Sequence, residues 1–222
     1  MNEQEKEYFS KIEYRPGDHR AARLYGRTML SWFLERIKVD GSSLLEIGAG
    51  PGVFSFQLLK RSRRLVALDA FRNQLARNPA ALRVAALGEM LPFRDDSFDF
   101  VLVANILHHV KRPVIILKEA RRVSRRNVLL IEPNALNPAQ VFFSLVAKEE
   151  LGGLFSFPWL IEDMAVRAGL GVREMTGFGA FTQNRTPYWL ARLLLPLQRS
   201  FFMGLYILAV LEPGTPQVKG RS

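Results

Sequence analysis

An acidic residue and three glycines alternate in one short stretch of this chain, in an order suited to ligand binding. Glu46, Gly48, Gly50 and Gly52 follow an apolar run and precede a second one. Glycine is needed where the main chain takes a positive φ or where a ligand approaches the backbone without room for a Cβ atom. A strand, a tight turn and a helix N-terminus in this order form the usual ligand site of a parallel sheet. A glycine-rich turn without a ligand is the plainer interpretation.

A second acidic residue ends the next apolar run. Asp69 follows residues 65–68, near the offset of about 20 residues at which nucleotide-binding α/β folds place an acid on the ribose. An ionised carboxylate accepts hydrogen bonds from both ribose hydroxyls. Phe71 follows two positions later, where its ring can cover one face of adenine.

The order Glu-x-Gly-x-Gly-x-Gly differs from the dinucleotide fingerprint, which would require glycine where Val53 stands. It resembles motif I of class I S-adenosylmethionine-dependent methyltransferases. Residues 87–104 are similar to a segment of the UbiE/type-11 small-molecule branch of that family. The resemblance implies S-adenosylmethionine as the cofactor. The predicted cofactor-binding residues are Glu46, Gly48, Ala49, Gly50, Gly52, Asp69, Ala70, Phe71, Glu89, Met90 and Asn105.

The chain departs from the family pattern at the adenine side of the expected site. The acid that usually faces the adenine amine falls on Leu87. Either Glu89 takes over this contact, with Met90 beside it, or the backbone alone contacts adenine.

Two adjacent histidines follow the fourth apolar run. His108 and His109 lie in a stretch that resembles the Leu-His-His segment of the family, which sits near the transferable methyl group. On a helix they would point in different directions, so we expect one of them to face the pocket. His109 is the candidate general base, with a structural histidine as the alternative and Glu132 as a weaker candidate base. We expect no acidic or histidine cluster after the fourth strand, and hence no metal site.

These residues lie on separate apolar runs, so a parallel sheet must bring them to one edge. The runs predict seven strands, at residues 44–47, 65–69, 82–86, 100–104, 127–132, 171–178 and 203–211. The resemblance implies an α/β fold: a Rossmann-like seven-stranded mixed sheet with helices on both faces and an antiparallel last strand.

The helical patterns suggest coverings around this sheet. Apolar residues recur at steps of three and four over residues 19–38, which predicts an amphipathic helix within an N-terminal cap at residues 1–42. The domain proper would span residues 43–222, with apolar lid segments at about 135–155 and 186–200. A greasy substrate pocket, an interfacial membrane helix and a dimer interface are competing interpretations of the second segment, which includes a predicted helix at 187–200.

Composition bounds the class of protein. The 222 residues are 48% hydrophobic and include no cysteine and three histidines, which excludes a disulfide framework and a thiolate metal site. The formal charge of +10 comes largely from basic runs such as 60–64 and 118–126. Both runs precede predicted strands, so we interpret them as solvated helix ends at the amino edge of the sheet. The first residues are polar, unlike a signal peptide, which predicts a cytoplasmic protein.

The sequence therefore predicts methyl transfer from S-adenosylmethionine to a small, partly apolar or lipid-like acceptor. An RNA or protein methyltransferase and a non-catalytic cofactor-binding scaffold are the alternatives, although the charge pattern disfavours nucleic acid. Peripheral membrane contact through the apolar C-terminal segment is compatible with the pattern, and the oligomeric state stays open. We expect surface roles for Tyr14, His19 and Arg20, and a frayed end at residues 214–222.

Overall fold

A seven-stranded mixed sheet forms the centre of the protein. The structure, a computed structural model, describes residues 11–12 and 14–214, except for the side chains of residues 148 and 149. The strand order is β3-β2-β1-β4-β5-β7-β6. Among the described strands, β7 runs in the direction opposite to the other six. The predicted fold class is thereby confirmed. The strands are β1 (Ser43–Ile47), β2 (Arg64–Asp69), β3 (Leu82–Ala85), β4 (Phe98–Ala104), β5 (Ser124–Pro133), β6 (Leu170–Phe178) and β7 (Tyr206–Pro213).

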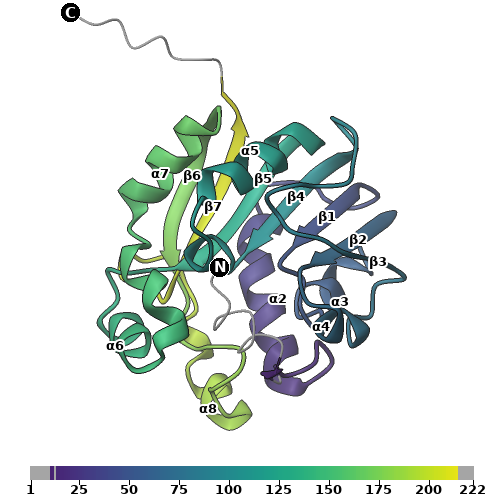
Figure 1. The fold of residues 1–222 in the computed structure, drawn as a ribbon. Coiled ribbons are helices and arrows are strands. Elements are labelled where there is room, and N and C mark those ends of the chain that lie inside the picture. The colour runs from purple at the N-terminus through teal and green to yellow at the C-terminus, as the bar shows by residue number, and fades with distance from the viewer. Residues whose placement is uncertain (1–10, 13, 215–222) are drawn as a thin grey trace, which may run out of the picture.

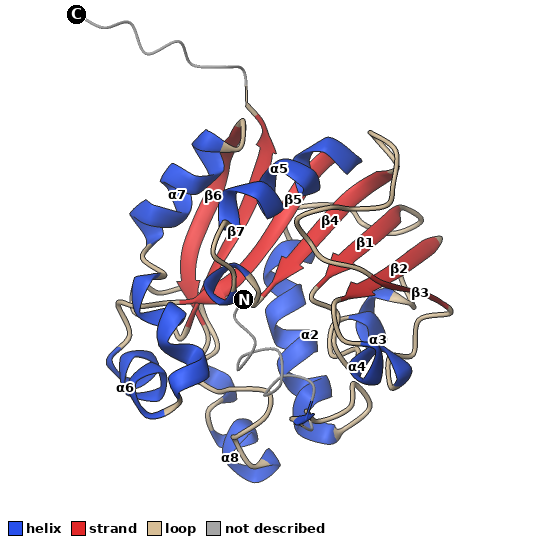
Figure 2. Cartoon of the chain, in the orientation of Figure 1, coloured by secondary structure: helices blue, strands red, loops and turns tan. Residues whose placement is uncertain are grey.

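Helices cover both faces of this sheet (Figure 2). On one face, α2 (Arg20–Leu34), α3 (Ser55–Leu58) and α4 (Arg72–Ala76) enclose one apolar core. On the other face, α5 (Pro113–Val123) and α7 (Pro158–Arg167) enclose a second core. Successive residues of the central strands alternate between the two cores, as the pleat of a strand requires. Because both faces are covered, the central strands read as nearly continuous apolar runs.

The remaining helices lie beyond the carboxyl ends of the parallel strands (Figure 1). They are α6 (Pro138–Val146) and α8 (Tyr188–Leu193). Three 3-10 segments accompany them: η1 (Leu107–His109), η2 (Lys148–Phe155) and η3 (Leu195–Leu197). All of these except η1 come from chain segments that were expected to form lids.

The helix expected over residues 187–200 is broken into α8 and η3. Pro196 has no N–H to donate to the carbonyl of Arg192, so the α-helical ladder cannot continue past this point. The last strand begins at Tyr206 rather than at residue 203. Its uncharged sequence is explained by its place between β5 and β6, where residues 206–211 are buried.

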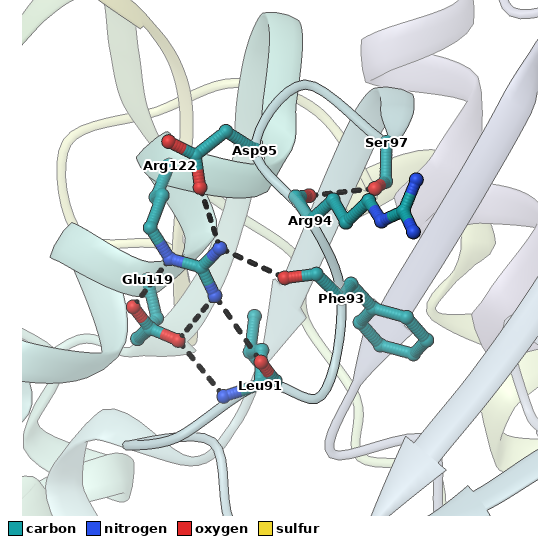
Figure 3. A network of polar contacts seen from close by, with 7 residues as sticks. All are labelled: Leu91, Phe93, Arg94, Asp95, Ser97, Glu119 and Arg122. Atoms are coloured by element: carbon teal, nitrogen blue, oxygen red, sulfur yellow. Dashed lines mark hydrogen bonds and ion pairs between the residues drawn. The ribbon is translucent and has the colours of Figure 1, made fainter.

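The basic runs lie at the amino ends of β2 and β5, as expected, and part of their charge is used inside the molecule. Figure 3 shows Arg122 donating to Asp95, to Glu119 and to the carbonyls of Leu91 and Phe93. Since Glu119 also accepts from the N–H of Leu91, this network holds the loop before β4 against α5. The arginine therefore has a structural role, in agreement with the interpretation of these runs as helix ends.

Among the described residues, no helix is both long enough and apolar enough to span a membrane. The frayed end expected at 214–222 lies, beyond Gly214, outside the described residues.

Candidate active site

A cavity of about 390 Å³ lies at the carboxyl edge of the sheet. It is lined by the residues that end β1, β2, β4 and β5 and by segments from the helical end of the molecule. Its volume falls within the range of roughly 300–1,000 Å³ that is typical of small-molecule sites. The cavity therefore lies where the predicted ligand site was expected.

The glycine loop forms one wall of this cavity. Gly48 and Gly50 line it and have φ angles of +78° and +45°, in the left-handed region that favours glycine. A Cβ atom at Gly48 would overlap the side chain of Ile106, whereas one at Gly50 would meet no atom within 4 Å. Gly50 thus leaves open space above its backbone, which suits a ligand lying across the loop.

Two predicted cofactor residues support the loop from outside the cavity. Gly52 is not among the lining residues, and its φ of +91° lets the chain pass close to Pro79. Glu46 is also absent from the wall, because its carboxylate is buried and accepts a hydrogen bond from the Ser55 hydroxyl. Burial raises the pKa of Glu46 to about 8. Both residues shape the glycine loop in this structure.

Asp69 joins the loop to the next strand. Its Oδ2 accepts from the N–H of Gly50 at 2.8 Å, and its Oδ1 accepts from the N–H of Phe71 at 2.9 Å. Burial raises the pKa of its carboxyl, against the effect of these backbone hydrogen bonds. An ionised carboxylate has about four acceptor positions, and the backbone N–H groups of Gly50, Ala70 and Phe71 use some of them, which leaves room for a ribose hydroxyl.

The expected adenine side is formed by the segments after β2 and β3. Ala70, Phe71, Leu87 and Glu89 all line the cavity. Met90 does not line it, and 77% of the residue is exposed, because the turn before Leu91 directs it outward.

The acceptor side of the cavity holds both histidines. Asn105 lines the cavity with a φ of +53°, and the single 3-10 turn of η1 follows it. The rings of His108 and His109 lie with their centroids 3.8 Å apart, and both residues line the cavity. The expectation that only one would face the pocket is therefore wrong, because this short turn does not separate its side chains as an α-helix would.

Two carboxylates hold His108. Its Nδ1 lies 2.6 Å from Glu132 and its Nε2 lies 3.4 Å from Glu150. Burial alone would lower the pKa of His108, but the two carboxylates raise it to about 9. Glu132 is itself buried and accepts from the N–H groups of Ile106 and Leu107, so its role is to fix η1.

Glu150 is the site residue that sequence reasoning missed. Its carboxylate lies 4.0 Å from Nε2 of His109. Burial alone would raise its pKa, but the hydrogen bond and charge of His108 lower it, which leaves the carboxylate ionised at neutral pH. The sequence marked this place only by the glycine pair at residues 152 and 153. In the structure, a Cβ atom at Gly152 would overlap the carbonyl of His108. This glycine lets η2 pack against η1 and so carries Glu150 to the histidines.

This arrangement corrects one expectation. His108, His109 and Glu150 offer ligand atoms within 4.8 Å of one another, so a cluster does gather after the fourth strand. Both ring nitrogens of His108 face carboxylates, and a protonated ring offers no lone pair to a metal. The prediction of no metal site stays a prediction.

Other lining residues come from parts of the chain that no motif marked. Tyr14, which was expected at the surface, lines the cavity, and Gln140 and Tyr206 line the acceptor side. The other two residues that were expected at the surface have structural contacts there. His19 accepts from the N–H of Ala21 at the start of α2, and Arg20 lies over the ring of Tyr188.

The fold and the site together define a class of protein. A sheet of this order, with a glycine loop after β1, an acid at the end of β2 and a cavity between them, has the fold of the class I S-adenosylmethionine-dependent methyltransferases.

Comparisons with known proteins agree. Residues 45–131 match the type-11 family described as a methyltransferase domain, so this part of the chain is similar to that domain. An uncharacterised methyltransferase of Mycobacterium marinum is 33% identical over 137 residues, which are 55% of this chain and 53% of that protein. The ubiquinone/menaquinone biosynthesis C-methyltransferase UbiE of Roseobacter denitrificans is 30% identical over 132 residues, with 53% and 52% covered. The chain spans about half the length of these curated relatives.

Solved structures show the same fold. A methyltransferase of Thermotoga maritima, described as a possible histamine N-methyltransferase, has a TM-score of 0.66 at 15% identity and covers 87% of this chain and 91% of its own. The magnesium protoporphyrin IX methyltransferase of Synechocystis, solved with bound S-adenosylhomocysteine, has a TM-score of 0.58 at 12% identity, with 86% and 83% covered.

S-adenosylmethionine is the cofactor of this class, and the cavity fits it. The open space over Gly50 would leave room for the amino-acid part, and Asp69 would be the acceptor for a ribose hydroxyl. Phe71 and Leu87 offer apolar surface to adenine.

Proposed function

We propose that the protein transfers a methyl group from S-adenosylmethionine to a small, partly apolar acceptor that must lose a proton. The observation that carries this proposal is the continuity of the cavity. Gly50 and Asp69 line the cavity, and so do His109 and Glu150. The proposed cofactor-binding and proton-accepting residues therefore share one cavity.

The cofactor, when bound, supplies a methyl group on a positively charged sulfur. Residues of this chain then have two tasks, namely to hold the acceptor in line with that methyl group and to take up its proton. Nε2 of His109 and Oε2 of Glu150 lie 4.0 Å apart, and both residues line the cavity, so a hydroxyl beside this pair can donate its proton to His109. We assign His109 as the general base and Glu150 as the group that stabilises the imidazolium formed.

His108 positions the proposed pair of His109 and Glu150. Its charge, held by Glu132, keeps the carboxylate of Glu150 ionised and in place. Apolar groups such as Phe143 and Ile106 line the same side of the cavity and exclude water. An acceptor with an apolar body and an ionisable hydroxyl or carbon acid suits this combination, and the similarity to UbiE is in keeping with a small-molecule acceptor.

A non-catalytic scaffold is the second candidate function, because the chain lacks the family's adenine-facing acid. A scaffold has no need to keep the space over Gly50 and His109 open, whereas this chain lines a cavity with both. The open cavity therefore favours catalysis.

Calorimetric titration with S-adenosylmethionine and S-adenosylhomocysteine tests the cofactor part. We expect micromolar binding of both ligands, and a loss of at least about tenfold in the Asp69→Ala variant, because a charged acceptor of ribose hydroxyls is removed. Asp163→Ala, which removes an exposed acid of α7, is the matched control and should bind as the parent does. Absence of binding by the parent would refute the proposal.

Transfer of an isotopically labelled methyl group tests catalysis. Phenols, hydroxylated apolar compounds and RNA would be offered as acceptors, each with and without EDTA. We expect transfer to a member of the first two classes, unchanged by EDTA. Transfer to RNA alone, at comparable concentration, would redirect the assignment to a nucleic-acid methyltransferase.

A further inference from the structure

Most exposed large apolar side chains of the described residues lie at one end of the molecule. They come from residues 142–160 and 189–203, and those elsewhere are scattered. We call this surface the apolar end; it comprises α6, η2, the first turn of α7, α8, η3 and residues 201–203. We propose that the apolar end docks on the surface of an anionic lipid bilayer.

The first part of the apolar end is an apolar helix with an unpartnered face. Phe142, Leu145 and Val146 on α6 are each at least 60% exposed. The face continues on η2 with Phe155, which is 70% exposed, and on α7 with Trp159. Residues 134–147 contain no charged residue, and the polar side chains of α6, Gln140 and Ser144, are buried, so its exposed face is apolar. Side chains of this kind and number are typical of an interaction surface.

The second part comes from the segment between β6 and β7. Trp189 and Leu193 stand four residues apart on α8 and are 68% and 69% exposed. Leu197 and Phe202 extend the apolar surface beyond the helix. The two parts are joined, because the Asn137 side chain donates to the carbonyl of Met203. Figure 1 shows α6 and α8 at the same end.

The charge of the apolar end and its connecting residues favours an anionic partner. Residues 179–203 contain Arg185, Arg192 and Arg199, all exposed, and no aspartate or glutamate. The acids of the apolar end are Glu149 and Glu150 on η2, which also carries Lys148, and Glu150 faces the two histidines of the cavity. Arginine beside exposed tryptophan matches the layer of anionic headgroups above the hydrocarbon of a membrane. A short amphipathic helix with this composition binds in the interface and does not span it.

A groove on the apolar end could connect a bilayer surface with the site cavity. Apolar residues such as Leu190, Leu194 and Phe201 line a groove of about 610 Å³ between α6 and α8. Phe143 and Arg185 line both this groove and the site cavity. If the proposed methyl transfer holds, the groove is the route by which an acceptor dissolved in the bilayer reaches the cavity. The docking itself does not depend on that activity.

A second copy of the chain is the main rival occupant of the apolar end. A symmetric dimer places the same surface patch of both copies together. Arg185, Arg192 and Arg199 of one copy would then approach those of the other, and the apolar end offers them only Glu149 and Glu150 of η2, of which Glu150 already faces His108. The charge pattern therefore favours a bilayer.

Tryptophan fluorescence on vesicles tests the proposal directly. The chain has three tryptophans, of which Trp159 and Trp189 lie on the apolar end, whereas Trp32 is buried in the core. With vesicles of phosphatidylcholine and phosphatidylglycerol at three to one, we expect a blue shift and quenching by brominated acyl chains. Vesicles of phosphatidylcholine alone should bind at least about tenfold more weakly, and 0.5 M salt should reduce binding to the mixed vesicles.

A pair of charge-introducing variants provides the matched comparison. Trp189→Glu combined with Leu193→Glu should reduce sedimentation with the mixed vesicles by at least about tenfold. Val166→Glu, an exposed apolar residue of α7 outside the apolar end, should sediment as the parent does. Circular dichroism and the affinity for S-adenosylhomocysteine should be unchanged in both variants, which separates a docking defect from a folding or cofactor defect.

Three outcomes would overturn the proposal. One is absence of binding of the parent chain to the mixed vesicles. Another is equal binding by the double variant and the parent. The third is a parent dimer, measured by light scattering, that the double variant converts to a monomer without any vesicle binding, because the apolar end would then be a dimer interface.

Discussion

The side chains around the proposed acceptor site divide into a proposed reacting pair and a pair that positions it. His109 and Glu150 face the cavity with their polar atoms 4.0 Å apart. His108 also lines the cavity, but its ring is held by Glu132, which accepts from two backbone N–H groups as well. This division predicts different kinetic effects for the two pairs.

Removal of the proposed base pair should slow transfer without weakening cofactor binding. We expect His109→Ala and Glu150→Gln each to lower kcat by roughly 10²–10⁴-fold, because proton uptake is lost or its charge is unstabilised. The double variant should be little slower than the worse single one, since the residues act as a unit. Single-turnover kinetics and calorimetry on the same preparations measure both quantities. A full rate in both single variants would show that the proton leaves by another path.

Stability should fall as the pH rises through the titration of His108. The pKa is about 9 in the folded chain and near 6.5 in the unfolded one. The ion-paired histidine thus contributes fully below pH 6.5, and its contribution is lost as the pH rises through 9. The difference is of the order of 3 kcal/mol.

The measurement is urea unfolding between pH 6 and pH 9.5, with His108→Gln as the comparison. Glu46, whose folded pKa is about 8, adds a slope of the same sign at lower pH in both proteins. The difference between the two unfolding curves isolates His108. Parallel curves across the whole range would contradict the proposed ion pairing.

At the scale of elements, the packing of η2 on η1 assembles the acceptor side. Gly152 lies so close to the carbonyl of His108 that a Cβ atom would overlap it. Gly152→Ala should therefore shift η2 away from η1 and withdraw Glu150 from the histidines. We expect kcat to fall by at least about tenfold, with little change in the affinity for S-adenosylmethionine.

A second glycine provides the control for this variant. At Gly171 a Cβ atom would make only ordinary contacts, at 4.0 Å, so Gly171→Ala should retain the parent rate. If Gly152→Ala kept the parent rate as well, η1 and η2 would tolerate separation, and Glu150 would not need its place beside the histidines.

At the scale of the whole molecule, the cavity joins segments that are distant in sequence. Tyr14 from the N-terminal segment, the glycine loop and Tyr206 of β7 all line it. A ligand there binds the folded chain and not the unfolded one, so it stabilises by mass action. At a hundred times its dissociation constant, S-adenosylmethionine should add about 2.7 kcal/mol.

Thermal unfolding measures this linkage. For a chain of this size the expected rise in Tm is about 5–10 °C. Asp69→Ala should show a smaller rise at the same ligand concentration, and Asp163→Ala should show the full rise. An equal rise in all three proteins would place the ligand away from the loop that Asp69 supports.

The sequence by itself determined the sheet and the glycine-loop wall of the cavity. The ends of β1 and β2, the positive-φ glycines and the acid that ends β2 lie within about 25 consecutive residues, and each depends on local backbone needs. The break in the helix at Pro196 also follows from the local sequence, because proline cannot continue an α-helix. The apolar pattern over residues 187–200 nevertheless predicted one continuous helix. Local rules were therefore sufficient for Gly48, Gly50 and Asp69.

Only the tertiary structure decided the acceptor side and the apolar end. Glu150 carries no motif, and it reaches the histidines because two short 3-10 segments pack together at Gly152. The uncharged residues of β7 and the apolar residues of α6 look alike in sequence, yet β7 is buried between strands and α6 is exposed. Composition records that a side chain is apolar, whereas the neighbours that cover it are set by contacts between distant segments.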